Sequence, residues 1–468
     1  MENSELRQAA GQGLRTFVEW AVRQELTDIP AHARQKAVMI IADDMAAMLS
    51  AEHEPQIVAA QARLAERGTA SLFRRDRAQL SVAQAALGNA LSASWNELDE
   101  GYRKAVCHAG LYTLPALLAI AESDNLPASE VIRASTLAYE TTARFAKTWR
   151  FESLRIHPHA LFCAVGVTAA VGFIRRLPAG LMLSALANAS TLGVVGPYNQ
   201  AVRGALIRNA WAAAGINNGF HAIEWAQAGI SGLPETPHDV YFETLGSEAN
   251  IAELTADLGT EWAVASGYHK INACCQYAHS SIEAMQQILR EQPALLGGAG
   301  VDRIRIETHR LGMTLDDHQP VTTLGAKFSL PHALAASLVY GHGGAEAFGS
   351  EAVQDERVAR LRGQVEMRLV PEELPWPQDR PAFVTLVGAD GQTYSANCLS
   401  ARGGPDRPFG DQELWDKIAG LSQASAPGLA AAMRQLHALA GGSAADAQLA
   451  QPWRQWVDRF FDPAATRA

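Results

Sequence analysis

The sequence is poor in cysteine and has no apolar run long enough to cross a bilayer, and these absences exclude several classes of protein. It has five cysteines, an odd number, in 468 residues. Such a chain does not carry the disulfide framework of a small secreted domain. The first residues also lack the charged-then-apolar pattern of a secretory signal. We therefore expect a protein of the reducing cytoplasm with no membrane partner.

Positive charge is also scarce. Charged residues make up 19% of the chain and the formal net charge is −10. An acidic protein repels the phosphate backbone, so we expect no nucleic-acid partner. If the substrate is an anion, its pocket must be locally basic against this acidic background. A chain of 468 residues is too long for one simple core, which predicts two domains or one elaborated domain.

Most of the first two-thirds of the chain shows the spacing of apolar residues that is typical of α-helices. These segments are rich in alanine, which lets helices approach closely, so a compact helical bundle is predicted. The predicted helical segments are 80–95, 111–122, 129–147, 159–176, 181–193 and 205–228.

The pattern changes after about residue 265. Apolar and polar residues alternate in 301–308 and 365–369, which predicts half-exposed strands, and 382–403 is typical of a hairpin that turns at Asp390-Gly391. We therefore predict a mainly α fold. Its large helical domain comprises 1–265 and 410–468, and a smaller α+β domain, 266–409, is inserted between them. Helical segments within the insert are predicted at 273–290, 329–340 and 350–361.

The stretch HKINACCQYAHSSIEAM, residues 269–285, favours three competing interpretations: a metal site, a redox pair or one wall of an active site. Adjacent cysteines do not form a CxxC redox pair, and no second pair completes a four-sulfur zinc site. Cys275 and His279 have helical i, i+4 spacing, but no further ligand pair stands out. We therefore predict no metal, with Lys270 and Cys275 in the wall of a cleft between the domains and Cys274 in the core.

Two other stretches place polar groups beside predicted helices. In WNELDEGYRKAVCHAG, acidic and basic residues precede His108 and a helix that begins near Gly110. This pattern is typical of a solvated loop, yet free N–H groups at a helix start also suit a carboxylate ligand. In RIHPHA, His157 and His159 flank a proline before a helix, where a histidine is more often a cap than a catalyst. Arg208 falls in an apolar helical segment, and an inward-facing arginine needs an anion.

Taken in order, these motifs resemble those of the MmgE/PrpD family. The resemblance rests on ELDEGYR…CHAG, RIHPHA, GALIRNAWAAAG, HKINACCQYAHSSIEA and AKFSLPHALAASLVYG, and extends over about residues 10–440. The family contains 2-methylcitrate dehydratase, cis-aconitate decarboxylase and iminodisuccinate epimerase. It implies a large helical domain with a smaller α+β domain, a homodimer, and proton transfer next to a carboxylate of a small di- or tricarboxylic acid. No metal or organic cofactor is implied.

Carried over position by position, the resemblance places several polar residues of these motifs around the substrate. Arg208 stands where the decarboxylase has a lysine, Cys275 where it has a histidine, and His332 where it has a tyrosine, which leaves the substrate open. The implied catalytic residues are His157, His108 and Lys270, and the implied substrate-binding residues are Asp99, Arg103, Arg208, Cys275 and His332.

The chemistry that these residue types support is proton abstraction. A histidine titrates near neutral pH and suits the base, and preorganised cations stabilise the enolate-like charge that develops. We predict that His157 transfers the proton with His108 as its partner, and the order of acid and base stays open. The predicted reaction is dehydration of a 2-methylcitrate-like hydroxy acid. Epimerisation, decarboxylation and a non-catalytic binding role are the alternatives.

Overall fold

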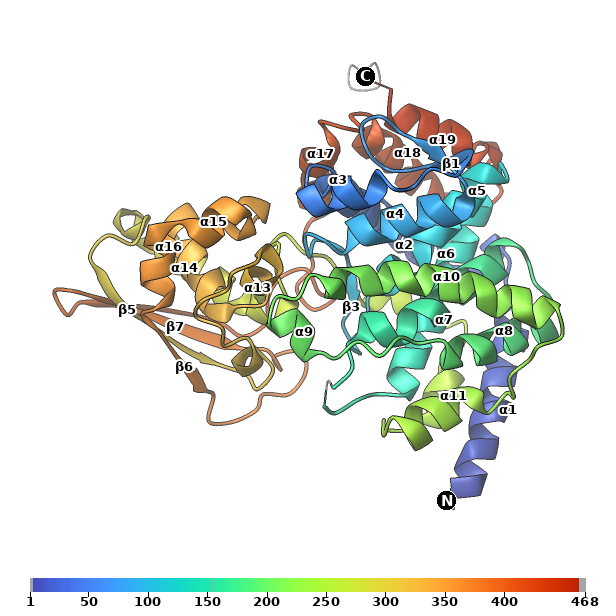
Figure 1. Ribbon diagram of the computed structural model, residues 1–468, viewed down its shortest axis with the longest axis horizontal. Coiled ribbons are helices and arrows are strands. Elements are labelled where there is room, and N and C mark those ends of the chain that lie inside the picture. Colours follow the sequence, from blue (N-terminus) through green and yellow to red (C-terminus); the bar gives the residue numbers. More distant parts are fainter. Residues whose placement is uncertain (1–2, 154, 463–468) are drawn as a thin grey trace.

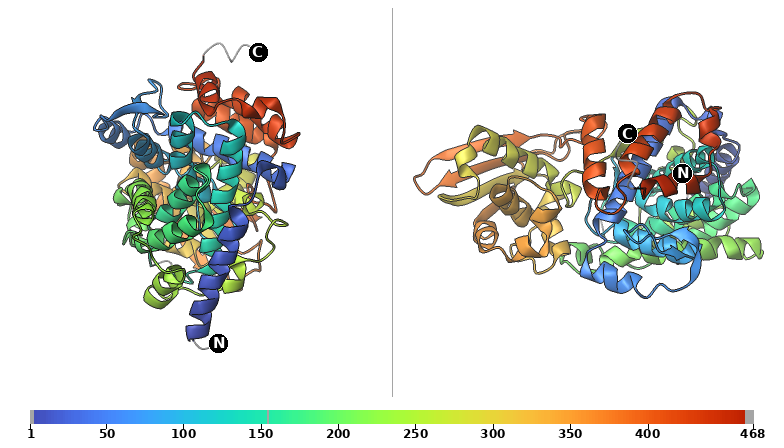
Figure 2. Two further views of the ribbon diagram at one scale, coloured as in Figure 1. Left: turned by 90° about the vertical axis from the view of Figure 1, so that its right-hand side faces the viewer. Right: turned by 90° about the horizontal axis from the view of Figure 1, so that it is seen from above.

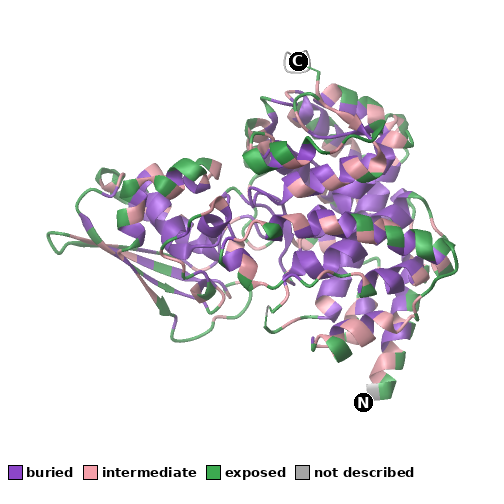
Figure 3. Cartoon of the chain, in the orientation of Figure 1, coloured by how far each residue is buried: buried purple, intermediate pink, exposed green. Residues whose placement is uncertain are grey.

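The hydrophobic residues pack into two main cores, one in each of the two bodies visible in Figure 1. The structure is a computed structural model that describes residues 3–153 and 155–462. Figure 3 shows that buried residues fill both bodies and continue through the segments that join them. The fold is mainly helical, as predicted, and strands form only small sheets.

The larger core is a bundle of helices around α7. Every residue of α7 is buried, and α5, α6 and α10 surround it. Close approach depends on small residues: a Cβ on Gly166 would lie 2.6 Å from the Tyr112 Cβ. The C-terminal helices α17 and α18 return to pack on α2 (Figure 2). The principal helices are α1 (Asn3–Ala21), α2 (Ala31–Ser50), α4 (Val82–Ala93), α5 (Ala109–Ser123), α6 (Ala128–Thr148), α7 (Pro158–Ile174), α8 (Ala179–Thr191), α10 (Ile207–Gln227), α17 (Asp411–Ser422), α18 (Leu429–Gly441) and α19 (Trp453–Phe460).

The smaller core lies between a four-stranded sheet and the helices on it. The strand order is β6-β5-β7-β8, with β5 (Val301–Thr308) parallel to β6 (Val365–Leu369) and antiparallel to β7 (Ala382–Gly388). β7 and β8 (Thr393–Cys398) form the predicted hairpin, and Gly391 adopts a φ of +82° in its turn. Helices α12 (His279–Glu291), α14 (Leu330–Tyr340) and α16 (Glu356–Arg362) contact the sheet or one another.

Two predicted helices of this domain have other limits. The helix predicted over 273–290 begins only at His279, because the backbone before it bonds elsewhere. Ala273 N–H donates to the Gly343 carbonyl at 2.7 Å, and Cys275 N–H donates to the Lys327 carbonyl at 2.9 Å. The helix predicted over 350–361 is divided into α15 (Ser350–Gln354) and α16. Lys270 and Cys275 therefore lie on a loop and not on a helix, so helical spacing does not determine where their side chains point.

That loop also changes the interpretation of the cysteine pair. Cys275 precedes a short 3₁₀ turn, so it does not share one helix with His279 as an i, i+4 zinc pair requires. The His279 Nε2–H instead donates to the Cys274 carbonyl at 3.2 Å. Cys274 is fully buried, which confirms its predicted place in the core. Among the described residues, no helix combines the length and apolar character needed to span a membrane.

Candidate active site

A two-residue antiparallel ladder brings the acidic loop to the lysine of the 269–285 stretch. In it β3 (Gly101–Tyr102) pairs with β4 (Gly267–Tyr268), with Gly101 opposite Tyr268. Extending this register by two residues sets Asp99 opposite Lys270, and their side chains meet at 3.4 Å. Only glycine fits at 101, since a Cβ there would lie 2.5 Å from the Tyr268 ring. The ladder thus positions the charged groups that follow.

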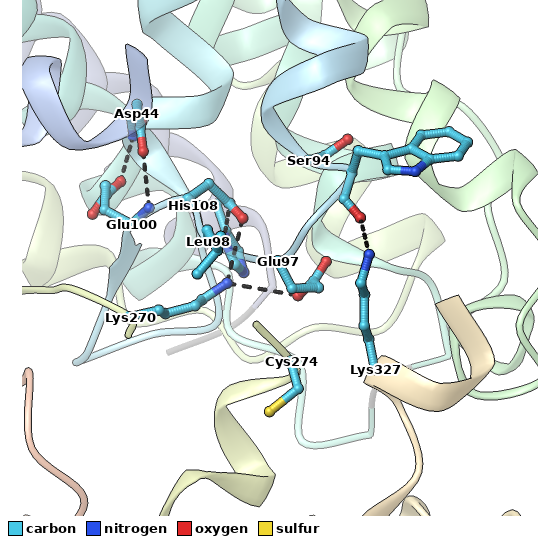
Figure 4. A network of polar contacts seen from close by, with 12 residues as sticks. Asp44, Ser94, Glu97, Leu98, Glu100, His108, Lys270, Cys274 and Lys327 are labelled. Atoms are coloured by element: carbon cyan, nitrogen blue, oxygen red, sulfur yellow. Dashed lines mark hydrogen bonds and ion pairs between the residues drawn. The ribbon is translucent and has the colours of Figure 1, made fainter. Parts of the chain in front are cut away.

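The loop that leads to Asp99 is held by two lysines from distant segments, of which Figure 4 shows Lys327. The Lys327 amine donates to the Trp95 carbonyl and to Asn96 Oδ1, both at 2.9 Å. The Lys417 amine donates to the Leu98 carbonyl at 2.8 Å. Backbone carbonyls in a buried loop need such donors, because water does not reach them. The loop is therefore a rigid support for its side chains.

Two cations and two carboxylates form a buried cluster at the end of this loop. The Lys270 amine lies 3.6 Å from Glu97 and 3.4 Å from Asp99, and Arg208 pairs with Glu97. Burial alone would raise the pKa of Asp99, but Lys270 and His108 hold it well below its usual range. The same carboxylates keep the pKa of Lys270 above its usual value despite burial. The anion that an inward-facing Arg208 requires is therefore Glu97.

His108 faces this cluster as one half of an Asp–His pair. It is the N-cap residue of α5, and its Nδ1 lies 2.7 Å from Asp99 Oδ2. Because the carboxylate is ionised, Nδ1 carries the proton and donates it. In the neutral form of the ring Nε2 then has the lone pair, and it has no hydrogen-bond partner among the described residues. This arrangement suits a base, since Asp99 both orients the ring and stabilises the imidazolium that forms.

His157 has a hydrogen-bond donor directed at each of its ring nitrogens. It caps α7, and its Nδ1 accepts the backbone N–H of His159 at 3.1 Å. The Arg208 Nε–H donates to Nε2 at 3.3 Å. A neutral imidazole has a lone pair on only one ring nitrogen, so it accepts one of these two donors at a time. Burial lowers the pKa of His157 well below its usual value, and the Arg208 charge lowers it further, so the ring is neutral and its tautomer depends on where Arg208 points.

His159 lies with His108 and His157, although the sequence indicated it only as the residue beside the proline and not as a site residue. Its ring stands edge-to-face between His108 and His157, with centroids 4.9 Å and 4.5 Å away. Nδ1 lies 2.8 Å from the Tyr112 hydroxyl, while the buried Nε2 has no partner among the described residues. Its i+2 position after His157, where its N–H sets the tautomer of that ring, is the signal that could have identified it. His159 thus fixes the spacing of the other two rings.

His108 and His157 border a cavity between the two domains. The cavity has a volume of about 40 Å³, enough for a few water molecules. Its helical-domain side carries Glu97, His108, His157 and Arg208, and its other side carries Lys270, Cys275, Tyr277 and Arg380. The structure therefore brings five of the eight predicted site residues to one cavity, and Asp99 lies behind His108 and Lys270. Arg380 was not predicted, because it lies in none of the motifs.

The other two predicted residues lie elsewhere, and the structure corrects their placement. Arg103 does not line the cavity, because its guanidinium is bound by the Asp379 carboxylate and the Pro377 carbonyl. His332 is buried in the smaller domain, where its Nε2–H donates to the Ala347 carbonyl at 2.9 Å. Phe328, at the end of the preceding short helix, reaches the cavity instead. The first turn of α14 thus directs the His332 side chain into the core of the smaller domain and away from the cavity.

The start of α5 also differs from expectation, because its N–H groups are not free for a ligand. Gly110 N–H donates to Glu100 Oε1 at 2.6 Å, and Glu100 N–H donates to Asp44 Oδ1 at 2.8 Å. Burial raises the pKa of Glu100 to about 8, although hydrogen bonds from Gly110 and Tyr139 oppose the shift. Burial and the nearby Glu100 raise the pKa of Asp44 too. Glu100 therefore retains its proton through much of the neutral pH range.

Glu100→Gln is expected to flatten the dependence of stability on pH. The pKa of Glu100 is about 8 in the folded protein against 4.5 when exposed. The protonated Glu100 therefore contributes to the free energy of unfolding, and this contribution is full below pH 4.5 and is lost as the pH rises to 8. One such proton changes the free energy of unfolding by up to about 1.4 kcal/mol per pH unit. Urea unfolding between pH 5 and 8 measures the slope. An equal slope in the variant would mean that the proton is held elsewhere.

Comparison with known proteins finds one family across most of the chain. Residues 15–246 match the MmgE/PrpD N-terminal domain, and residues 273–439 match the MmgE/PrpD C-terminal domain. The cis-aconitate decarboxylase-like protein oryM of Aspergillus oryzae is 24% identical over 437 residues, which cover 86% of this chain and 89% of that protein. A cis-aconitate decarboxylase of Aspergillus terreus is 24% identical over 351 residues, covering 68% and 70%.

Proposed function

The chain belongs to the MmgE/PrpD family, and on that premise we propose that it is a lyase that moves a proton next to a carboxylate of a small di- or tricarboxylic acid. The observation that carries the proposal is the pair of unlike histidines that line one cavity. His108 is bound to the Asp99 carboxylate through Nδ1, whereas His157 is buried and lies against the Arg208 guanidinium. A base and an acid that face one substrate are what elimination requires.

In this mechanism His108 is the base. Its Nε2 removes the proton from the carbon next to the substrate carboxylate, and Asp99, 2.7 Å from Nδ1, stabilises the imidazolium. Negative charge then develops on the substrate as an enolate-like group. Lys270 and Arg208 line the same cavity, so their charges stabilise it. The rigid loop and ladder hold these groups in place before the substrate arrives, which avoids reorganisation during the reaction.

We propose His157 as the acid in the same mechanism. When the anionic substrate draws the Arg208 Nε–H away from Nε2, the ring proton lies on Nε2, because Nδ1 accepts the His159 N–H. That proton passes to the leaving hydroxyl, which departs as water. The proposal thus gives an order to the acid and the base, and in it His108, not His157, abstracts the proton.

The reaction that this acid supports best is dehydration of a 2-methylcitrate-like hydroxy acid, since a leaving hydroxyl needs a proton. Decarboxylation is the second candidate, and the names of the relatives from Aspergillus favour it. It needs no acid at the leaving group, because carbon dioxide departs without one. Epimerisation stops at the enolate and returns the proton. Dehydration and epimerisation share the removal of a proton by the base, whereas decarboxylation leaves a carbanion that takes up a proton from an acid.

Proton NMR in deuterated water separates these candidates. The purified protein is incubated with a panel of hydroxylated and unsaturated di- and tricarboxylic acids, including 2-methylcitrate and cis-aconitate. Loss of water supports dehydration, loss of carbon dioxide supports decarboxylation, and solvent deuterium at the carbon next to a carboxylate, without product release, supports epimerisation. A panel in which no acid reacts or exchanges would exclude the proposed function.

His157→Asn is expected to slow elimination by about 10²-fold or more while leaving proton abstraction active. The asparagine side chain still accepts the His159 N–H, so the start of α7 keeps its cap and the melting temperature changes little. In deuterated water the variant should therefore exchange the substrate proton faster than it forms product. If exchange and product formation fall by the same factor, His157 is the base and the assignment is reversed.

A further inference from the structure

Arg380 is a buried arginine on the cavity wall opposite the histidines. It lies in the loop before β7, is 8% exposed and reaches the cavity from the smaller domain. Its guanidinium stacks over the Tyr277 ring at 5.0 Å, and one amino group donates to Gln276 Oε1. Both contacts fix the plane of the guanidinium. Its Nε is buried and has no hydrogen-bond partner among the described residues.

The charges around the cavity form one balanced group and one unbalanced group. Lys270 and Arg208, from opposite sides of the cavity, are matched by the carboxylates of Glu97 and Asp99. Around Arg380, a single carboxylate lies near two arginines.

That carboxylate is Asp379, and its partners are unequal. Two nitrogens of Arg103 contact it, the nearer at 2.5 Å, whereas Arg380 Nε stays 3.6 Å away. Arg103 thus takes the carboxylate, and Arg380 keeps a positive charge without a hydrogen-bonded anion. Leaving a charge unpaired in a buried wall is costly, so an anionic ligand is expected to complete the site.

We propose that Arg380 binds a second carboxylate of the substrate, remote from the carbon that loses its proton. The inference rests on the proposed function and deepens it, because it restricts the substrate class to acids with at least two carboxylates. The first carboxylate lies toward Lys270 and Arg208, next to the reacting carbon, and the second spans the cavity to the smaller domain. The planar fork of an arginine binds a carboxylate through two N–H groups, which fixes the orientation of the substrate.

The test compares two inert ligands that differ in one carboxylate: methylsuccinate and 2-methylbutyrate. Calorimetry should show that the unmodified protein binds methylsuccinate about 100-fold more tightly, as expected for a buried charge-assisted pair. Arg380→Met should reduce this preference to a few-fold by weakening methylsuccinate alone. Arg368→Met is the matched control: it removes an exposed arginine of the same domain, outside the cavity, and should leave the preference unchanged.

The possible outcomes separate the subsite from the proposed function. If the unmodified protein prefers methylsuccinate and Arg380→Met keeps the full preference, the second carboxylate binds elsewhere and the subsite is wrong while the function stands. A protein that turns over a polycarboxylate but shows no preference between the two ligands also excludes the subsite. If it binds neither ligand and converts no acid of the panel, the function itself fails.

A second variant covers the case in which Arg380→Met does not fold. Arg380→Lys keeps the charge and loses the planar fork, so its preference for methylsuccinate should fall to about 10-fold. An unchanged preference in this variant would contradict recognition by the fork. Thermal melting of each variant shows whether it is folded before its affinity is interpreted.

Discussion

Replacing His108 with glutamine is expected to slow turnover by about 10³–10⁴-fold, the full contribution of a positioned base. Glutamine keeps a polar side chain near Asp99 but has no group that takes up a proton at neutral pH. Stability should fall modestly, as in the control below, because the buried Asp99 carboxylate loses the 2.7 Å hydrogen bond from the ring. In deuterated water the variant should also lose the exchange of the substrate proton, which the His157→Asn variant retains.

A second Asp–His pair in the same protein is the matched control. His269 Nδ1 lies 2.7 Å from Asp43, the same separation as between His108 and Asp99, but His269 does not line the cavity. His269→Gln is therefore expected to lower the melting temperature and to keep turnover within about 10-fold of the unmodified protein. Equal losses of turnover in both variants would mean that His108 acts by supporting the structure and not as the base.

Much of the fold follows from spacing in the sequence. Alanine-rich helical spacing predicts α5, α6 and α7, because helices that are buried on several sides must be apolar and small. Alternation predicts β5, β7 and β8, because one face of each strand meets the core. The start of α12 could not be predicted, since it depends on hydrogen bonds from residues that are distant in the chain, such as the Lys327 carbonyl.

Some residues of the candidate site could likewise be predicted from the sequence, and others could not. His108 and His157 could be predicted because each stands where a loop becomes a helix, in a motif that resembles a family. Arg380 could not, since it belongs to no motif and reaches the cavity only when the two domains pack together. Nor does the sequence reveal that Glu97 pairs with Arg208 and Lys270, because three distant segments supply these residues. Glu97 also has a φ of +53°, which only the surrounding fold imposes.

This pairing changes what is expected of Lys270. A lysine that only binds substrate could be removed without cost to the fold, but Lys270 is fully buried and lies near two buried carboxylates. Lys270→Met leaves one of those charges uncompensated. The free energy of unfolding should fall by about 3–5 kcal/mol, as for other broken buried ion pairs. Turnover should fall by about 10²–10³-fold as well, because a cation at the cavity wall is lost. Urea unfolding and steady-state kinetics measure the two effects.

The two effects can be separated by restoring the balance of charge. Glu97→Gln in the Lys270→Met background leaves one cation, Arg208, and one carboxylate, Asp99, in the buried cluster, so about half of the lost stability should return. Turnover should not return, since no cation replaces the amine at the cavity wall. A double variant no more stable than Lys270→Met would show that Lys270 does not balance Glu97. If turnover recovers together with stability, Lys270 serves only to hold the buried carboxylates and does not act on the substrate.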